Sequence, residues 1–168
     1  MKRIIFIILL TLAATILQAQ SVNFKWAKQM GGTGAYAAAG SIAVDAAGNV
    51  YTTGYFGGTA DFDPGPGTYN LTSAGTYEMF ISKLDSSGNF IWAKQMGGNS
   101  SLDYATGLSI TLDAAGNIYS TGPLEGTVDF NPGPGVFTLS AIGVNRTRAS
   151  FVLKLDADGN FIWAKQTG

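Results

Sequence analysis

Short runs of β-forming side chains follow one another along most of the chain, and each run ends in a small cluster of Gly, Asn, Asp or Pro. No stretch in this region shows the 3.6-residue period of an amphipathic helix. The motif Asp-x-x-Gly-Asn stands between two such runs four times, beginning at Asp45, Asp85, Asp113 and Asp156. Asp at the first position of a turn accepts backbone N–H groups, and Gly at the fourth adopts the left-handed conformation of a hairpin turn. The pattern therefore predicts hairpins of antiparallel strands.

These hairpins lie in two copies of one unit. Residues 40–98 are closely duplicated by the segment from residue 107 to the end, first at an offset of 68 residues and later, after three extra residues around 144–149, at an offset of 71. Each unit predicts four strands, for which we expect the ranges 41–45, 49–56, 79–84 and 90–96, then 108–113, 117–122, 150–155 and 160–166. Four short antiparallel strands in a tandem unit are typical of a β-propeller blade, and a β-solenoid is the weaker alternative.

The segment from Val22 to Met30 repeats the sequence of a fourth strand without the three strands that precede it in a unit. We interpret the chain as a signal peptide at 1–20, an orphan outer strand and linker at 21–39, one blade at 40–98 and a second at 99–168. The predicted fold is an all-β, incomplete propeller of about two blades plus one orphan N-terminal strand. Two blades cannot cover each other's open faces, so either the chain is a fragment or copies of it assemble.

The first twenty residues carry the pattern of a secretory signal. Lys2 and Arg3 precede an apolar run at 4–16 that is shorter than the roughly 20 residues of a membrane span, and Ala19 follows it as a small residue for cleavage. This pattern predicts a secreted or cell-surface protein. Without residues 1–20, eight basic and eleven acidic side chains remain, a formal charge of −3, and they are scattered singly. Such a surface disfavours nucleic acid as a partner. The chain has no Cys, so packing alone must stabilise the fold.

Oxygen ligands recur in a Pro-Gly-rich insert inside each unit. Asp61 and Asp63 precede Pro64 in the first copy, and Asp129 and Asn131 hold the same places in the second. Ca²⁺ binds six to eight oxygens, and each pair with nearby carbonyls could supply part of such a shell. The alternative is that an Asp or Asn before Pro simply forms a turn, which is ordinary turn chemistry and the interpretation we favour.

The remaining chemistry is sparse. The chain contains neither His nor Cys, which excludes a Ser-His-Asp triad, a thiol nucleophile and an ordinary zinc site within it. The recurring carboxylates indicate architecture, so we predict no enzymatic activity and no catalytic residue. Three Phe-x-Trp pairs are expected to place both rings on one strand face, as blade-to-blade core or, less favoured, as a sugar platform. Arg146 and Arg148, near the three-residue insertion, could grip an anion, although solvated charges are the simpler interpretation.

Several ordered elements together resemble the SBBP β-propeller repeat family of secreted bacterial proteins. They are Gly-Asn-Val-Tyr-Thr-Thr-Gly at 48–54, the segments Lys-Leu-Asp-x-x-Gly-Asn-Phe-Ile-Trp-Ala-Lys-Gln, and the Asp-Phe-Asp/Asn-Pro-Gly insert. The resemblance implies a multi-bladed propeller in an exported protein, without a defined activity. We expect a non-enzymatic scaffold or binding platform whose partners are further blades of the same protein, identical subunits, or a glycan or protein. The alternatives are a two-blade lectin-like subunit that completes a ring by homo-oligomerisation, and a carboxylate-dependent carbohydrate-active enzyme fragment.

Overall fold

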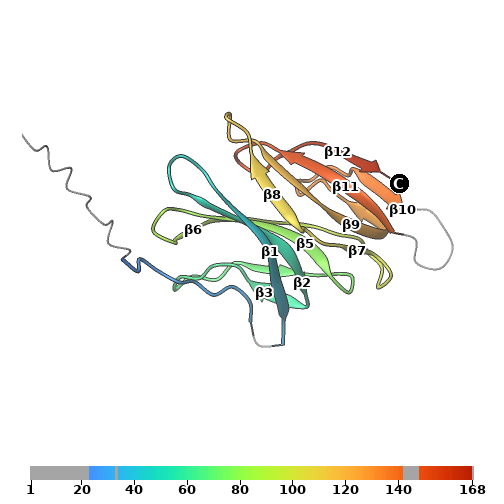
Figure 1. Cartoon of the computed structure of the whole chain (residues 1–168). Coiled ribbons are helices and arrows are strands. Elements are labelled where there is room, and N and C mark those ends of the chain that lie inside the picture. Colours follow the sequence, from blue (N-terminus) through green and yellow to red (C-terminus); the bar gives the residue numbers. More distant parts are fainter. Residues whose placement is uncertain (1–22, 33, 142–147, 168) are drawn as a thin grey trace, which may run out of the picture.

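The computed structural model describes residues 23–32, 34–141 and 148–167, and all regular structure in these ranges is β-strand. Two antiparallel sheets stand next to each other (Figure 1), and we call them blade 1 and blade 2. Blade 1 has the strand order β1-β2-β5-β6, with bounds β1 (Tyr36–Val44), β2 (Val50–Gly57), β5 (Glu78–Leu84) and β6 (Phe90–Met96). Its inserted hairpin consists of β3 (Thr59–Asp61) and β4 (Asn70–Thr72).

Blade 2 repeats this arrangement around one long strand. Its strands are β7 (Tyr104–Ala105), β8 (Ser109–Leu112), β9 (Ile118–Asp129), β10 (Thr138–Ala141), β11 (Arg148–Leu155) and β12 (Phe161–Thr167). The two short strands β7 and β8 together take the place of β1, and both pair with the long strand β9. The short strand β10 pairs with the C-terminal end of β9. The expectation of two propeller-type, four-stranded antiparallel units is confirmed.

All eight strands predicted for the two units are present, with ends that differ by a few residues. The largest differences are that β1 begins at Tyr36 and that β9 continues to Asp129, into the first strand of the inserted hairpin. The N-terminal segment differs from expectation, because residues 23–30 form no ladder and only Gly31 makes a bridge, to Asp61. In both blades the fourth strand pairs with the third strand of the same blade. No described segment lies beside residues 23–30 as such a third strand, so these residues have no ladder partner. The predicted signal peptide at 1–20 and Arg146 lie outside the described residues.

The four Asp-x-x-Gly-Asn turns are built alike. In the first, Asp45 Oδ1 accepts the backbone N–H groups of Ala47 and Asn49, each at 2.9 Å, and Oδ2 accepts the Asn49 side-chain amide at 2.8 Å. The glycine at the fourth position has φ near +80° in every copy, a conformation that other residues adopt only with strain. These bonds hold the pKa of Asp45 below its ordinary value, chiefly through the Asn49 side chain.

The main core lies between the two blades. Tyr51, Met79, Ile81 and Met96 from blade 1 pack with a larger apolar group from blade 2 that includes Leu124. A second cluster on the other face of blade 1 is closed by its own inserted hairpin, with Phe62 of the insert packed against Phe56 and Phe80. Apolar burial between blades and under the inserts therefore holds the fold together without disulfides.

Residues 23–30 occupy the place that a preceding blade's outer strand would take. Trp26 donates its indole N–H to the Ser86 carbonyl at 3.1 Å, and a Cβ at Gly88 would lie 2.9–3.2 Å from Trp26 and Lys28. Blade 1 offers the same contact to blade 2, because a Cβ at Gly159 would lie 3.2–3.3 Å from Trp92 and Lys94. The N-terminal segment thus packs on the turn of blade 1 as β6 packs on the turn of blade 2.

Candidate functional site

The junction between the blades includes a specific polar contact. Lys83, on β5, lies over the ring of Tyr51 at 4.9 Å from its centroid and donates to the carbonyl of Ala157 in the β11–β12 turn at 3.5 Å. Trp92 stacks edge-on against the same tyrosine at 6.2 Å. Tyr51 is only 1% exposed, because blade 2 covers it. A lysine, a tyrosine and a tryptophan of one blade therefore receive the Asp-x-x-Gly-Asn turn of the next.

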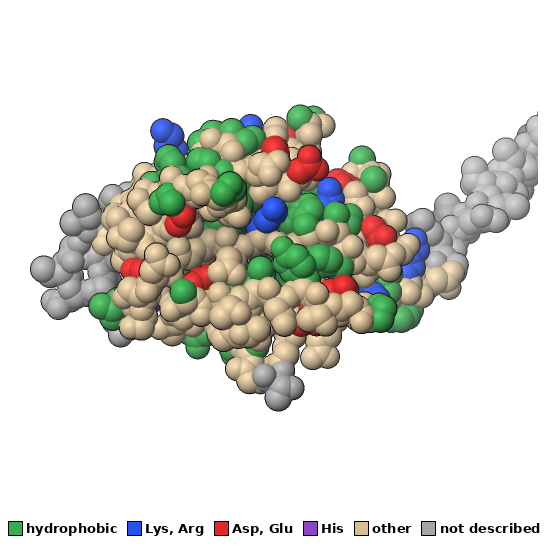
Figure 2. All heavy atoms as spheres, turned by 180° about the vertical axis from the view of Figure 1, so that it is seen from behind, with side chains coloured by type: hydrophobic (Ala, Val, Ile, Leu, Met, Phe, Trp, Pro, Cys, Tyr) green, Lys and Arg blue, Asp and Glu red, His purple; other side chains and the backbone are tan. Residues whose placement is uncertain are grey.

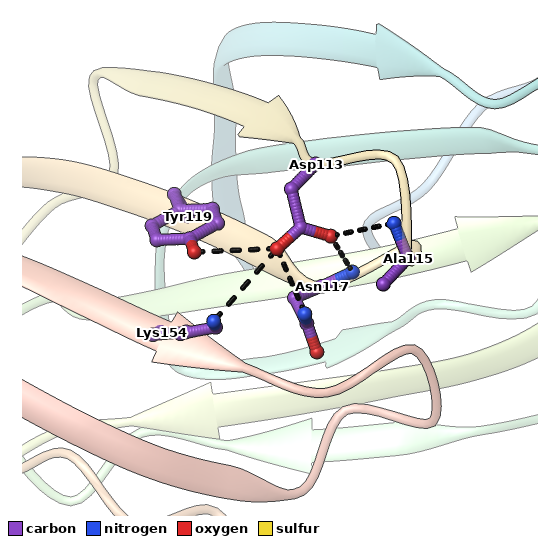
Figure 3. A network of polar contacts seen from close by, with 5 residues as sticks. All are labelled: Asp113, Ala115, Asn117, Tyr119 and Lys154. Atoms are coloured by element: carbon purple, nitrogen blue, oxygen red, sulfur yellow. Dashed lines mark hydrogen bonds and ion pairs between the residues drawn. The ribbon is translucent and has the colours of Figure 1, made fainter.

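Blade 2 carries the same three side chains on the face that points away from blade 1. Lys154 lies 4.9 Å from the ring centroid of Tyr119, and Trp163 stands edge-on to that ring at 6.2 Å. Figure 3 shows that Lys154 and Tyr119 both point toward Asp113, at 3.7 Å and 3.3 Å. Here the lysine meets a carboxylate of its own blade instead of a carbonyl of another. Together with Val152, the equivalent of Ile81, these residues form what we call the docking face: Tyr119, Val152, Lys154 and Trp163.

In charge and burial, the docking face of blade 2 resembles the junction between blades 1 and 2 without a blade covering it. The Asn117 side-chain amide, followed by backbone N–H groups and the Tyr119 hydroxyl, holds the pKa of Asp113 below its ordinary value against an opposing effect of burial. The contact with Tyr119 raises the pKa of Lys154, so this lysine stays charged. All four docking-face residues are only partly buried. Of their blade 1 equivalents, Tyr51 and Ile81 are fully buried, while Lys83 and Trp92 are partly buried in both places. Blade 2 therefore presents a preformed junction surface that nothing in the described chain covers.

The structure places the predicted calcium ligands in two separate hollows. Asp61 Oδ1 accepts the N–H groups of Asp63 and Tyr69, at 3.0 and 2.8 Å, and Asp63 Oδ1 accepts Gly65 N–H at 2.8 Å. Both aspartates line a polar hollow of about 500 Å³ beside Gln29 and Gly31. One oxygen of each carboxylate thus shapes the turn, and the pair shares the rim of one open hollow.

The second insert repeats this geometry. Asp129 Oδ1 accepts the N–H groups of Asn131 and Phe137, both at 2.9 Å, and Asn131 Oδ1 accepts Gly133 N–H at 2.9 Å. Its hollow, of about 250 Å³, is shared with Glu78, a buried carboxylate of blade 1 whose pKa is raised by burial against three hydrogen bonds. Within the described ranges, no three Asp or Glu side chains gather as a metal site would require. The calcium hypothesis stays a prediction.

The expectation that each Phe-x-Trp pair shares one face is wrong. In blade 1 the ladder pairs Lys83 with Trp92 but Leu84 with Phe90, so Ile91 is an extra residue that bulges out of register. Because neighbouring residues of β5 point to opposite faces, the bulge sends Phe90 and Trp92 to opposite faces as well. Phe90 joins the cluster under the insert, and Trp92 joins the junction with blade 2. Strict alternation along the strand could not reveal this bulge.

A cleft of about 420 Å³ lies where the two blades meet, at the end of the sheets opposite the Asp-x-x-Gly-Asn turns. Tyr77 of blade 1 and Tyr104 of blade 2 line it, together with Asp103, Glu125 and Arg148. The Arg148 guanidinium donates to the Glu125 carboxylate and also lies 5.9 Å from the ring centroid of Tyr104. The predicted solvated or anion-binding Arg148 is therefore held in an ion pair.

Sequence reasoning missed both the docking face and this cleft, although the repeat contained the signal for each. Lys83 and Lys154 begin the same Lys-Leu-Asp motif, and Tyr51 and Tyr119 end the same Gly-Asn-Val/Ile-Tyr motif. Tyr36 and Tyr104 are likewise separated by the 68-residue offset. Matching positions identify residues that recur, but the burial that distinguishes a covered junction from an open one appears only in the folded chain.

The comparison with known families agrees with this geometry. Residues 25–58 match the family model of the SBBP beta-propeller repeat, and this range runs from the Trp26 segment through β1 and its turn to the end of β2. The resemblance seen in the sequence is confirmed for this range. No curated protein matches the chain. Among the described residues, no apolar helix long enough to span a membrane is present.

Proposed function

We propose that the chain is a non-enzymatic, propeller-type repeat segment of a secreted or cell-surface protein, and that it serves as a scaffold and binding platform. One observation carries the proposal: blade 2 presents the same lysine, tyrosine and tryptophan that blade 1 uses to receive another blade. Such a surface suits a partner with an Asp-x-x-Gly-Asn turn. Export rests on the basic and apolar pattern of residues 1–20. The surface in Figure 2 shows single charges and small apolar groups rather than one large charged field.

The partner on the docking face is then a further blade, either from the same protein or from an identical subunit. The N-terminal segment bears on this choice. Trp26 and Lys28 occupy the turn of blade 1, which is where Trp163 of a second copy would have to pack in a head-to-tail ring. A second copy of the chain would have to displace this segment. A last blade of the same protein with only three strands of its own would instead leave the segment in place, because the segment would serve as its fourth strand. Further blades of the same protein therefore fit better than identical subunits.

The experiment that tests this proposal extends the chain by one repeat. A second copy of residues 99–168 fused after Gly168 should cover the docking face and raise the free energy of unfolding by about 5 kcal/mol, the order expected for a few hundred Å² of buried apolar surface. The matched control carries Lys154→Ala and Trp163→Ala in the middle blade and should lose most of the gain. An extended chain that unfolds in two separate transitions, with the original one unshifted, would contradict docking.

The rival arrangement, a ring of identical two-blade subunits, has its own readout. Light scattering of residues 21–168 over a wide concentration range should then give a defined oligomer that Lys154→Ala weakens and the exposed Lys25→Ala does not. A deletion of residues 21–30 should strengthen that association, because it clears the turn of blade 1. Association that is affected neither by Lys154→Ala nor by deletion of residues 21–30 would contradict the ring.

A further inference from the structure

A row of flat side chains crosses from blade 1 to blade 2 at the end of the sheets opposite the Asp-x-x-Gly-Asn turns. Tyr36 and Tyr55 lie 5.7 Å apart by ring centroids, and Tyr77 lies within 5.7 Å of both. Tyr77 then meets Tyr104 of blade 2 at 6.3 Å, and Arg148 follows over the Tyr104 ring at 5.9 Å. Five planar groups therefore follow one another in contact, with neighbouring rings tilted or edge-on, and Tyr36 at one end is half exposed.

The strand register explains how the blade 2 end of this row is built. Glu125 on β9 pairs with Tyr104 on one side and with Arg148 on the other. Directly paired residues share a face of the sheet, so the ring, the carboxylate and the guanidinium stand next to each other at the cleft. Asp103 completes the wall, where its carboxylate accepts the N–H groups of Ser100 and Thr127 at 2.9 and 3.0 Å.

The duplication inside the chain shows that these polar groups are not needed to build a blade. At the corresponding positions blade 1 has Ala35 for Asp103, Gly57 for Glu125 and Tyr77 for Arg148, although Tyr36 pairs with Gly57 as Tyr104 pairs with Glu125. Only the first tyrosine, Tyr36 or Tyr104, is common to both. Two carboxylates and a guanidinium therefore appear in one blade only, at the corner where the aromatic row of the other blade ends.

We propose that this cleft binds a neutral sugar ring, which gives the binding platform proposed above its ligand class. Its volume of about 420 Å³ lies within the range of small-molecule sites. The negative faces of tyrosine rings attract the weakly positive C–H face of a pyranose, while Glu125 and Arg148 offer an acceptor and donors for neighbouring hydroxyl groups. Asp103 and Glu125 outnumber Arg148, which disfavours an anionic ligand.

The backbone of the cleft argues against an extended peptide as the occupant. Strand addition requires a free edge with unpaired N–H and C=O groups. Here β9 is paired on both sides, with β7 and with β11. Recognition must therefore come from side chains, and those available are aromatic faces and hydrogen-bonding groups at fixed positions. The cleft is formed by two blades of one chain, so it does not depend on a partner at the docking face.

The test is saturation-transfer NMR on the full chain with D-glucose, D-galactose, D-mannose, N-acetyl-D-glucosamine, cellobiose and chitobiose, each added alone, and tetramethylammonium as a cationic probe. Irradiation of the tyrosine rings should transfer to ring C–H protons of at least one sugar. Arg148→Gln, whose side chain is 66% exposed in the native chain, should keep the fold and raise the Kd at least fivefold. Tyr104→Ala should do the same.

The matched control is Tyr69→Ala, an exposed tyrosine on the insert that stacks on Phe90 outside the cleft. It should leave sugar binding unchanged. The proposal fails if no sugar receives transfer, if only tetramethylammonium responds, or if Arg148→Gln and Tyr69→Ala have the same effect. None of these three outcomes depends on the free energy of unfolding of the extended chain. The sugar site and the scaffold role can therefore be contradicted separately.

Discussion

Replacement of one tyrosine by alanine at equivalent positions of the two blades would measure what the junction contributes. Tyr51 and Tyr119 make the same contacts within their own blades: each donates its hydroxyl to the turn aspartate at 3.3 Å, lies under a lysine at 4.9 Å and meets a tryptophan edge at 6.2 Å. They differ in burial, because blade 2 covers Tyr51 and nothing described covers Tyr119. The contacts within the blade therefore cancel in the comparison.

The expected difference follows from that burial. Truncation of a fully buried aromatic side chain to alanine costs about 3–5 kcal/mol, of which the cavity is a large part. Tyr51→Ala opens such a cavity between Trp92, Ile81 and the blade 2 core. Tyr119→Ala leaves a dent that water can fill, so it should cost only about 1–2 kcal/mol. We expect the two losses of unfolding free energy to differ by about 2–3 kcal/mol.

The assay is urea unfolding followed by circular dichroism, with the slope of each transition checked for two-state behaviour. It is run at a protein concentration at which light scattering gives a monomer, because a second copy on the docking face would bury Tyr119 and erase the difference. Equal losses for the two variants under these conditions would refute the assignment of Tyr51 to a covered junction and of Tyr119 to an open face.

Three further predictions use the same chain. The turn hydrogen bonds lower the pKa of Asp45, Asp85 and Asp113. Their stabilising effect is therefore present above the unfolded pKa of about 3.9 and is lost as the pH falls through the lower folded pKa. The melting temperature should decrease below about pH 4, and a melting temperature that stays constant in acid would contradict this. Gly107→Ala would place a Cβ 1.9 Å from the Thr53 hydroxyl across the junction and should cost about 1–3 kcal/mol in urea unfolding, whereas Gly32→Ala, with only ordinary contacts, should be nearly neutral. Millimolar calcium and a chelator should give the same melting temperature, because the insert carboxylates act in turns; a rise with calcium that the Asp63→Asn change removes would establish a metal site instead.

The regular strands were predictable because their signals are local. Each Asp-x-x-Gly-Asn motif stabilises a hairpin through hydrogen bonds between residues no more than four positions apart. The strands on either side can therefore be placed without tertiary information. The 68-residue duplication then groups the hairpins into two sheets. The additional strands β3, β4 and β10 were missed because their pairing depends on where the inserts fold back, and Pro-Gly-rich sequence gives no register for that. The strand β7 was missed because it lies ahead of the range expected for the first strand of its blade.

The face of each side chain was harder to predict than the strand that carries it. One extra residue at Ile91 separates Phe90 from Trp92, and period-two reasoning assigns both to the same side. The aromatic row was missed for a related reason: Tyr36 in β1, Tyr55 in β2 and Tyr77 just before β5 are far apart in the sequence and look unrelated there. Likewise, Arg148 resembled a solvated charge until its pairing with Glu125 placed it at a corner of the cleft.

The two ends of this repeat array are unequal, and the inequality has a physical basis. On the blade 1 side, Trp26 and Met30 reproduce the contacts of a preceding outer strand, where Met30 packs against the cluster under the insert as Met96 packs in the main junction. On the blade 2 side, Lys154 lies 3.7 Å from Asp113 of its own blade, and no turn of another blade in the described part of the chain faces it. The Lys154–Asp113 ion pair beside the partly buried Tyr119 contributes little stability in water. In blade 1 the equivalent Lys83 instead donates to the Ala157 carbonyl in the turn of the next blade, and this is the contact that the proposed partner blade would offer to Lys154.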